Sequence, residues 1–214
     1  MQHIRHVSGP ITGKWRLSAV TGLTTGLGAN APIFAARFAP TTFVRACITD
    51  LRIKAQIITP FTSAQEISAS IFIARSFTAS DTGGTAVTPA GLSGMVSSVS
   101  DSAYTTAFTD IRVATTAAIT AGTRTLDANP ILYLPGAQIL AATSAGQGYF
   151  ETDMTNGGDQ RFGINLQGQT NSVAANAEGI VVTLPIAQGA AGTVRYSIEV
   201  EWVEYVTNSA ESIS

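Results

Sequence analysis

Apolar and polar residues alternate without a break from Val194 to Trp202, near the end of the chain. Strict alternation with a period of two is typical of a β-strand that has one face on a core and one in water. It predicts that Val194 and every second residue up to Trp202 point into a core. Arg195, Glu199 and Glu201 are then expected to point to solvent.

The segment from Thr42 to Thr59 predicts a long strand whose phase changes in the middle. Apolar residues occupy even positions from Val44 to Ile48 and odd positions from Leu51 to Ile57. A slip of one residue moves the apolar set to the opposite face of a sheet. We therefore predict a β-bulge or bend near Thr49–Asp50.

Other stretches show shorter strand patterns separated by turn residues. Residues 79–109 are rich in Ser, Thr, Gly and Ala, and predict a long surface excursion with a short helix near Leu92–Val99. Asn156-Gly157 lies between two strand-like segments and predicts a hairpin with a loop longer than two residues. The further strands are expected at residues 15–20, 66–78, 110–116, 131–134, 149–154, 162–166 and 180–184.

About eight strands with almost no helix favour an all-β fold. The expected architecture is an antiparallel two-sheet sandwich with jelly-roll or Greek-key winding. Residues 1–32 carry many glycines and few periodic signals, and predict an extended N-terminal arm. Residues 33–207 are expected to form a single β-sandwich domain, and residues 208–214 a polar C-terminal tail.

Composition adds a hint of assembly. Charged residues make up only 12% of the 214 positions, about half of the usual share of ~25%. A surface of Thr, Ser, Ala and Gly suits contact with other protein better than contact with solvent. The alternative is an ordinary uncharged β-domain. The net charge of −2 and the mildly basic first 16 residues give no pull toward nucleic acid.

Cys47 is the only cysteine, so no disulfide can form within the chain. Its place in a strand pattern predicts a small buried apolar group, which fits folding in a reducing cytoplasm. The N-terminal residues contain no apolar stretch typical of a secretory signal. No run approaches the ~18 apolar residues of a membrane-spanning helix.

The sequence offers little for catalysis, and we expect no catalytic residue. His3 and His6 are the only histidines, and the arm in which they lie seldom holds an imidazole rigidly. Met1-Gln2-His3 has the spacing of a square-planar Cu(II) or Ni(II) site, which arises often by chance. Glu199 and Glu201 share a strand face, with Glu204 nearby, but carboxylates that alternate with core residues are expected to be solvated.

Binding motifs are equally weak, and we expect no metal and no cofactor. Phosphate-loop and dinucleotide patterns fail on spacing at 9–15 and 22–28, so these glycines are interpreted as loop residues. Isolated aromatic–basic pairs do not make a stacking platform for single-stranded nucleic acid. The pairs are Trp15 with Arg16, Arg37 with Phe38, and Arg161 with Phe162. Aspartates that could hold calcium, but without the ladder of closely spaced oxygens, are Asp81, Asp127, Asp153 and Asp159.

Four stretches resemble the small β-rich structural proteins of tailed-bacteriophage virions. They are GKWRLSAVTG at 13–22, APIFAARFAP at 31–40, FTASDTGGTAVTP at 77–89 and GTVRYSIEVEWVEY at 192–205. The resemblance lies in the composition, in the residues of the turns and in the last strand. It assigns no functional residue to this chain. It implies a capsid-associated protein present in many copies, made in the host cytoplasm and located in the virion. Decoration or cement proteins of this kind often form trimers that bridge the major capsid protein.

The leading hypothesis is therefore a non-enzymatic decoration or cement protein that stabilises a bacteriophage capsid. Its partners would be further copies of itself, with a trimer favoured, and the major capsid protein, but neither nucleic acid nor a membrane. The expected contacts are the N-terminal arm and the loop 79–109. Two alternatives are a carbohydrate- or receptor-binding β-module of a phage fibre or spike, and the sole jelly-roll coat protein of a small icosahedral virus.

Overall fold

A computed structural model describes residues 11–39, 44–87, 95–97, 106–134, 138–139, 151–153, 164–167 and 177–206. All regular secondary structure in these residues is β-strand, as the sequence predicts. The strands are β1 (Ile11–Val20), β2 (Ala31–Phe38), β3 (Val44–Thr59), β4 (Gln65–Glu66), β5 (Ala69–Arg75), β6 (Thr85–Val87), β7 (Met95–Ser97), β8 (Phe108–Val113), β9 (Thr125–Leu126), β10 (Leu132–Leu134), β11 (Gln138–Ile139), β12 (Glu151–Asp153), β13 (Ile164–Gln167), β14 (Glu178–Leu184) and β15 (Thr193–Val206).

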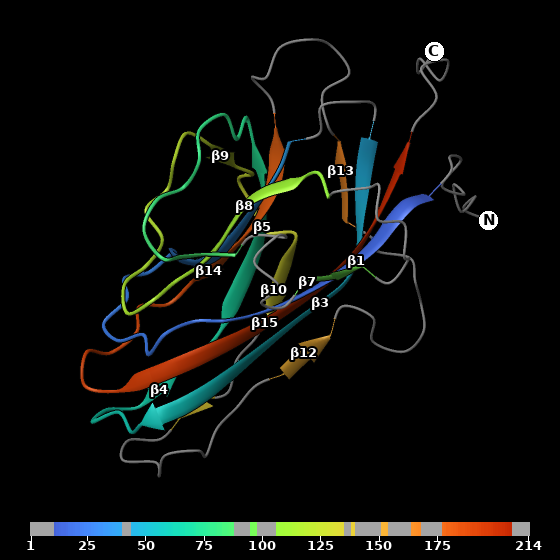
Figure 1. Ribbon diagram of the computed structural model, residues 1–214. Coiled ribbons are helices and arrows are strands. Elements are labelled where there is room, and N and C mark those ends of the chain that lie inside the picture. The colour runs from blue at the N-terminus through green and yellow to red at the C-terminus, as the bar shows by residue number, and fades with distance from the viewer. Residues whose placement is uncertain are drawn as a thin grey trace, which may run out of the picture.

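The strands form two large antiparallel sheets (Figure 1). Sheet A has six strands in the order β12-β3-β15-β1-β7, and β13 also pairs with β3. Sheet B has seven strands in the order β10-β5-β14-β2-β8-β6, and β9 also pairs with β5. A separate two-stranded ribbon joins β4 to β11.

The strand pairing is nested from the chain ends inward. The first strand pairs with the last (β1 with β15), and β2 pairs with β14. Further in, β3 pairs with β12 and β13, and β5 pairs with β9 and β10. A long antiparallel hairpin folded over on itself gives this order, which is the winding of a jelly roll. The predicted all-β sandwich is confirmed.

The two longest strands, β3 and β15, lie side by side at the centre of sheet A. Asp50 is opposite Glu201 and Ile48 is opposite Trp202, so Thr49 is an extra residue on β3. This irregularity confirms the bulge predicted from the phase change. It allows the apolar residues on both sides of the bulge to face the core, although their positions change from even to odd.

The core lies between the sheets and is joined across them by aromatic rings. Trp202 on β15 and Phe108 on β8 pack in a T-shaped arrangement, with ring centroids 4.9 Å apart. Phe108 in turn lies 5.2 Å from Phe38 on β2. Because Trp202 belongs to sheet A and Phe38 to sheet B, these contacts show which face of each sheet points inward.

The strand β2 has no counterpart among the predicted strands, because its residues do not alternate. Its middle residues and those of β14 are buried on both faces of sheet B. The ring of Phe77 lies against the outer face of β14, since a Cβ added to Gly179 would be 2.9 Å from this ring. A strand covered on both sides shows a continuous apolar run, which periodicity does not distinguish from other buried segments.

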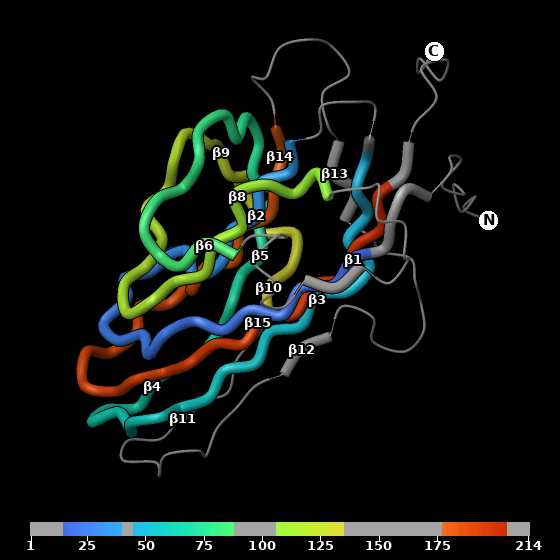
Figure 2. Tube along the Cα trace, viewed as in Figure 1, coloured from blue at the N-terminus to red at the C-terminus, as the bar shows by residue number. Residues whose placement is uncertain are grey.

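Residues 76–124 connect β5 to β9, and we call this segment the insertion. Its strands β6 and β8 extend sheet B beyond β2, and β7 extends sheet A beyond β1. Figure 2 shows the described loops of the insertion gathered at the side of sheet B that faces away from sheet A. The helix predicted near Leu92–Val99 is wrong at Met95–Ser97, which form a strand beside β1 because main-chain pairing outweighs a weak helical pattern.

Two further expectations are corrected by strand pairing. Residues Ile11–Val20 of the expected arm belong to the sandwich, because β1 fills the place between β15 and β7. The segments around Asn156-Gly157 do not form a hairpin in the described residues. Both β12 and β13 are antiparallel to β3, at Arg52–Lys54 and Arg45–Ile48, so they run in the same direction.

The two ends of the insertion approach closely at Gly122. A Cβ added there would lie 2.3 Å from the carbonyl oxygens of Ala79 and Ser80. We expect Gly122→Ala to lower the free energy of unfolding by about 1–3 kcal/mol, because backbone on both sides has to shift. Urea unfolding measures this, with Gly28→Ala as the control, since nothing lies within 4 Å of a Cβ at Gly28. Equal losses in both variants would contradict the prediction.

Candidate functional site

The outer face of sheet A is a ladder of charged side chains. Arg16 on β1 forms ion pairs with Glu201 at 3.1 Å and Glu199 at 3.8 Å on β15. Arg52 on β3 pairs with Asp50 at 3.1 Å. Glu199 and Glu201 lie on the outer face predicted by the alternation, and they neutralise an arginine. Partly exposed pairs of this kind contribute about 1 kcal/mol or less each.

Glu204 on β15 is buried, in contrast to its two neighbours. Its carboxylate accepts hydrogen bonds from the Trp202 indole N–H at 2.9 Å, from the Ala107 main-chain N–H at 3.1 Å, and from the Thr106 hydroxyl. The Thr106 hydroxyl accepts the N–H of Phe108 at 3.1 Å. The carboxylate thereby joins the end of β15 in sheet A to the start of β8 in sheet B.

The expectation of a solvated carboxylate does not hold for Glu204. Its position continues the even-numbered series from Val194 to Trp202, so it points to the inner face of sheet A. The alternation could have signalled the inward direction. One donor, Trp202, is two positions away on the same face of β15, but Thr106 and Ala107 lie almost a hundred positions earlier, and no local pattern predicts them.

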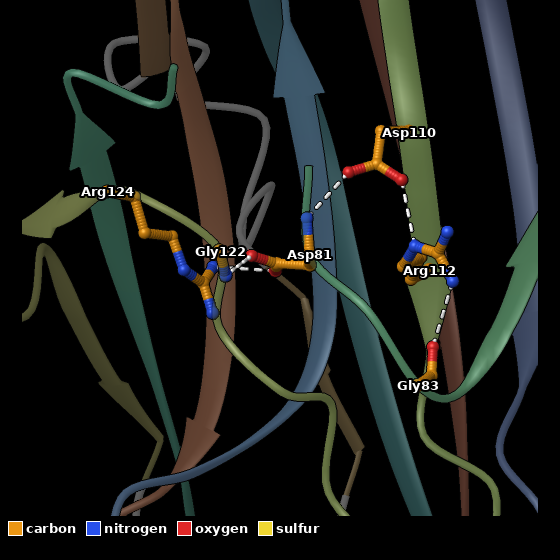
Figure 3. Close-up of polar contacts among 6 residues, drawn as sticks. All are labelled: Asp81, Gly83, Asp110, Arg112, Gly122 and Arg124. Carbon is orange, nitrogen blue, oxygen red and sulfur yellow. Dashed lines mark hydrogen bonds and ion pairs between the residues drawn. The ribbon is translucent and has the colours of Figure 1, made fainter. Parts of the chain in front are cut away.

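A second buried anion, Asp81, lies at the base of the insertion (Figure 3). Its carboxylate accepts the N–H of Gly122 at 2.8 Å and lies 3.2 Å from the Arg124 guanidinium. The Asp81 side chain is 0% exposed and that of Arg124 is 3% exposed. The Arg124 guanidinium also lies over the Phe77 ring, 5.2 Å from its centroid.

The Asp81 cluster continues to β8. Asp110 accepts the main-chain N–H of Asp81 at 2.9 Å and the Arg112 side chain at 2.8 Å. Arg112 also donates to the carbonyl of Gly83 at 2.9 Å. Asp110 has a left-handed backbone, with φ of 51°, in the irregular part of the β2–β8 pairing. These contacts fix the start and the end of the insertion against β8.

Burial has opposite effects on the two members of the buried ion pair. It raises the pKa of Asp81 above its ordinary value and lowers the pKa of Arg124, because each charge loses water. The Gly122 N–H and the Arg124 charge oppose the shift at Asp81. Each member of the pair therefore stabilises the charge of the other in the interior.

The carboxylates of Glu204 and Asp81 are both bound by donors from the protein itself, which indicates that these residues stabilise the fold. No group of three or more His, Cys, Asp or Glu side chains with metal-binding geometry occurs among the described residues. Of the calcium candidates, Asp81 faces Arg124, and Asp127 forms an ion pair with Arg75 at 3.1 Å. Asp153 lies in β12, and Asp159 lies outside the described residues.

The remaining sequence candidates are scattered in the structure. His3, His6 and the pair Arg161–Phe162 lie outside the described residues. The segment 11–15 of the first glycine pattern lies in β1 and forms no phosphate loop. The segment 22–28 is the connection between β1 and β2. Of the aromatic–basic pairs, Trp15 and Phe38 are both buried, so neither ring offers a stacking surface.

Cys47 differs from its predicted place in the core. It lies on the outer face of sheet A and is only partly buried, because the bulge at Thr49 places even positions of this part of β3 inward. Burial raises the pKa of its thiol.

The exposed large apolar residues among those described are Val20, Ile131, Tyr133 and Ile186. Val20 lies at the end of β1, and Ile186 follows β14. Ile131 and Tyr133 lie together at the β10 edge of sheet B. The described residues contain no helix that is long and apolar enough to cross a membrane.

By strand order the chain is a jelly-roll β-sandwich protein. No protein-family model and no curated protein sequence matches it. Among solved structures it is similar to the chain in the crystal structure of the 60-mer BFDV capsid protein. The two are 14% identical with a TM-score of 0.27, over 98% of this chain and 100% of that chain. A likeness of this size carries no argument about function.

Proposed function

We propose that this protein is a non-enzymatic structural subunit of a virus particle. More specifically, we propose that it assembles on a bacteriophage capsid as a decoration or cement protein and stabilises the shell. The observation that carries this proposal is the nested strand order, which is the winding found in viral capsid, lectin and cupin domains. Side chains decide among these three uses of the fold.

The side chains favour assembly over the other two uses. A cupin holds its metal largely with histidines, and this chain has only His3 and His6. A sugar site commonly stacks its ligand on an exposed aromatic ring, often a tryptophan, but Trp15 is 9% and Trp202 is 1% exposed. Among the described residues Tyr133 is an exposed aromatic ring, and its hydroxyl donates to Glu66 at 3.1 Å. The low charge of the whole chain suits burial of small and apolar side chains between copies.

We expect the purified chain to associate with itself or with phage shells. Light scattering should give a mass that is a multiple of 22.2 kDa, and empty tailed-phage shells should sediment together with the protein. Because apolar and small side chains would form the contacts, moderate salt should change the association little. A stable monomer that ignores the shells contradicts the proposal.

Two measurements separate the proposal from its alternatives. Selective binding on a glycan array, without self-association, would support a receptor-binding module of a fibre or spike. Nucleic acid enclosed in particles formed by this chain alone would support a sole coat protein. The proposed decoration or cement protein is expected to give neither result.

A further inference from the structure

Two arms of the insertion, residues 76–82 and 119–124, lie on the outer face of sheet B, and we call them the strap (Figure 2). Thr82 and Thr120 each donate a main-chain N–H to the carbonyl of the other, at 2.9 Å in both cases. The main chain therefore joins the two arms directly. The strap forms a layer of its own outside the two-sheet sandwich.

The strap covers an apolar part of this outer face. Val181 on β14 lies opposite Ala35 on β2, and both are 0% exposed. Alternation puts Val181 on the same face as Gly179, against which the Phe77 ring of the strap lies. The next residue, Val182, is also 0% exposed but points to the opposite face, into the core between the sheets. Two adjacent valines are thus buried by two different layers.

Few apolar side chains hold the strap on the sheet. Within the strap, Phe77 and Ile119 are the residues that belong to the hydrophobic core, and the exposed residues are serine, threonine and alanine. The other attachments are polar: the Asp81–Arg124 pair joins the arms, and Arg37 on β2 donates to the Phe77 carbonyl at 2.7 Å. Segments with few buried apolar contacts open at a lower free energy than the whole fold does.

The backbone is strained where the strap leaves sheet B. Ser76 directly follows β5 and has a φ of 49°, in the left-handed region that residues other than glycine seldom adopt. The Thr78 N–H donates to the carbonyl of Ser76 at 2.8 Å, which closes a very tight turn at this point. Strained conformations of this kind persist only where the surrounding structure holds them. Opening of the strap would relieve the strain at Ser76.

We propose that the strap opens as one unit while the two-sheet sandwich stays folded. Ser76 is the hinge, and the buried Asp81–Arg124 pair is the clasp, because it joins the first arm to the second. The open state exposes the apolar outer face of β14 and β2 that the closed strap covers. This opening is a property of the single chain and goes beyond the proposed role in a shell.

The reaction of a buried cysteine with a thiol reagent measures how often its cover opens. In a Cys47→Ser background, we expect Val181→Cys to react at least about tenfold faster than Val182→Cys. The two positions are adjacent on β14 and are both 0% exposed, so they differ in the layer that covers them. Near-ultraviolet circular dichroism checks that both variants are folded. Equal rates overturn the proposal, because both residues would then be reached only by unfolding of the sandwich.

Two further substitutions separate opening of the strap from unfolding of the sandwich. Asp81→Asn removes the charge of the clasp, and we expect it to speed the reaction of Val181→Cys about tenfold or more. Glu204→Gln weakens the link between the sheets without touching the strap, so it should speed the reaction of Val182→Cys and leave that of Val181→Cys unchanged. No effect of Asp81→Asn on Val181→Cys, or equal effects of Glu204→Gln at both positions, overturns the proposal.

Hydrogen exchange tests the opening in the unmodified chain. The N–H groups of Thr82 and Thr120 bond across the strap, so they should have similar protection factors. Both factors should be at least about tenfold below that of Ile198, which lies in the middle of sheet A between β1 and β3. Strap protection equal to that of Ile198 overturns the proposal, and so does unequal protection of the two threonines. Neither result bears on the proposed function, since no shell is present.

Discussion

Asp81→Asn is expected to lower the free energy of unfolding by about 3–5 kcal/mol, the range found when one partner of a buried ion pair is removed. The asparagine keeps an oxygen that can accept the Gly122 N–H, so the variant removes mainly the charge. Arg124, with a side chain only 3% exposed, then remains in the interior without its counter-charge 3.2 Å away. Urea unfolding followed by the fluorescence of the buried Trp15 and Trp202 measures the loss.

A double variant tests the cause of this loss. Asp81→Asn combined with Arg124→Met replaces the whole pair by uncharged side chains, and such replacements are often close to neutral. We therefore expect the double variant to be more stable than Asp81→Asn alone. Asp127→Asn serves as a control, since its pair with Arg75 is exposed and should contribute about 1 kcal/mol or less. A similar small loss at Asp81 would show that the charge is not needed.

Glu204→Gln is expected to cost about 2–4 kcal/mol, because it replaces a charged acceptor by a group that carries its own donors. The carboxylate accepts the Trp202 indole N–H, the Ala107 N–H and the Thr106 hydroxyl. All three donors reach Oε1, and the Ala107 N–H also lies 3.1 Å from Oε2. In glutamine one of the two oxygens becomes an NH2 group, which would face at least one of these donors. Because Trp202 is one of the partners, its emission spectrum should change together with the stability.

Glu201→Gln is the matched control for Glu204→Gln. Both residues are on β15, but Glu201 is on the outer face of sheet A and pairs with the partly exposed Arg16. We expect a loss of about 1 kcal/mol or less for this variant. If the two variants lost the same stability, burial and hydrogen bonding of Glu204 would not be the cause.

Periodicity predicted the elements that have one face on the core and one in water. The alternation from Val194 to Trp202 corresponds to the inner and outer faces of β15. The phase change near Thr49 corresponds to the bulge in β3. Both are local consequences of the two-residue repeat of a strand. Periodicity did not predict the strand β2, because both faces of this strand are buried and its residues therefore do not alternate.

The candidate chemistry was less accessible from sequence. Glu204 could have been placed on the inner face by its parity, but Thr106 and Ala107 reach it only because β8 joins sheet B. The sequence offers Asp81 as a possible calcium ligand, but nothing in it indicates that Arg124 is its partner. Partners separated by tens of residues are brought together by strand pairing, which no local pattern encodes.

The sequence by itself therefore determined the class of fold, the strands that alternate, the bulge at Thr49–Asp50 and the low share of charged residues in the chain. Each of these depends on single residues and their near neighbours. Only the tertiary structure decided the nested strand order, the burial of Asp81 and Glu204, and the exposure of Ile131 and Tyr133 at a sheet edge. These depend on which distant strands lie next to each other, because the same alternating pattern can pair in several orders.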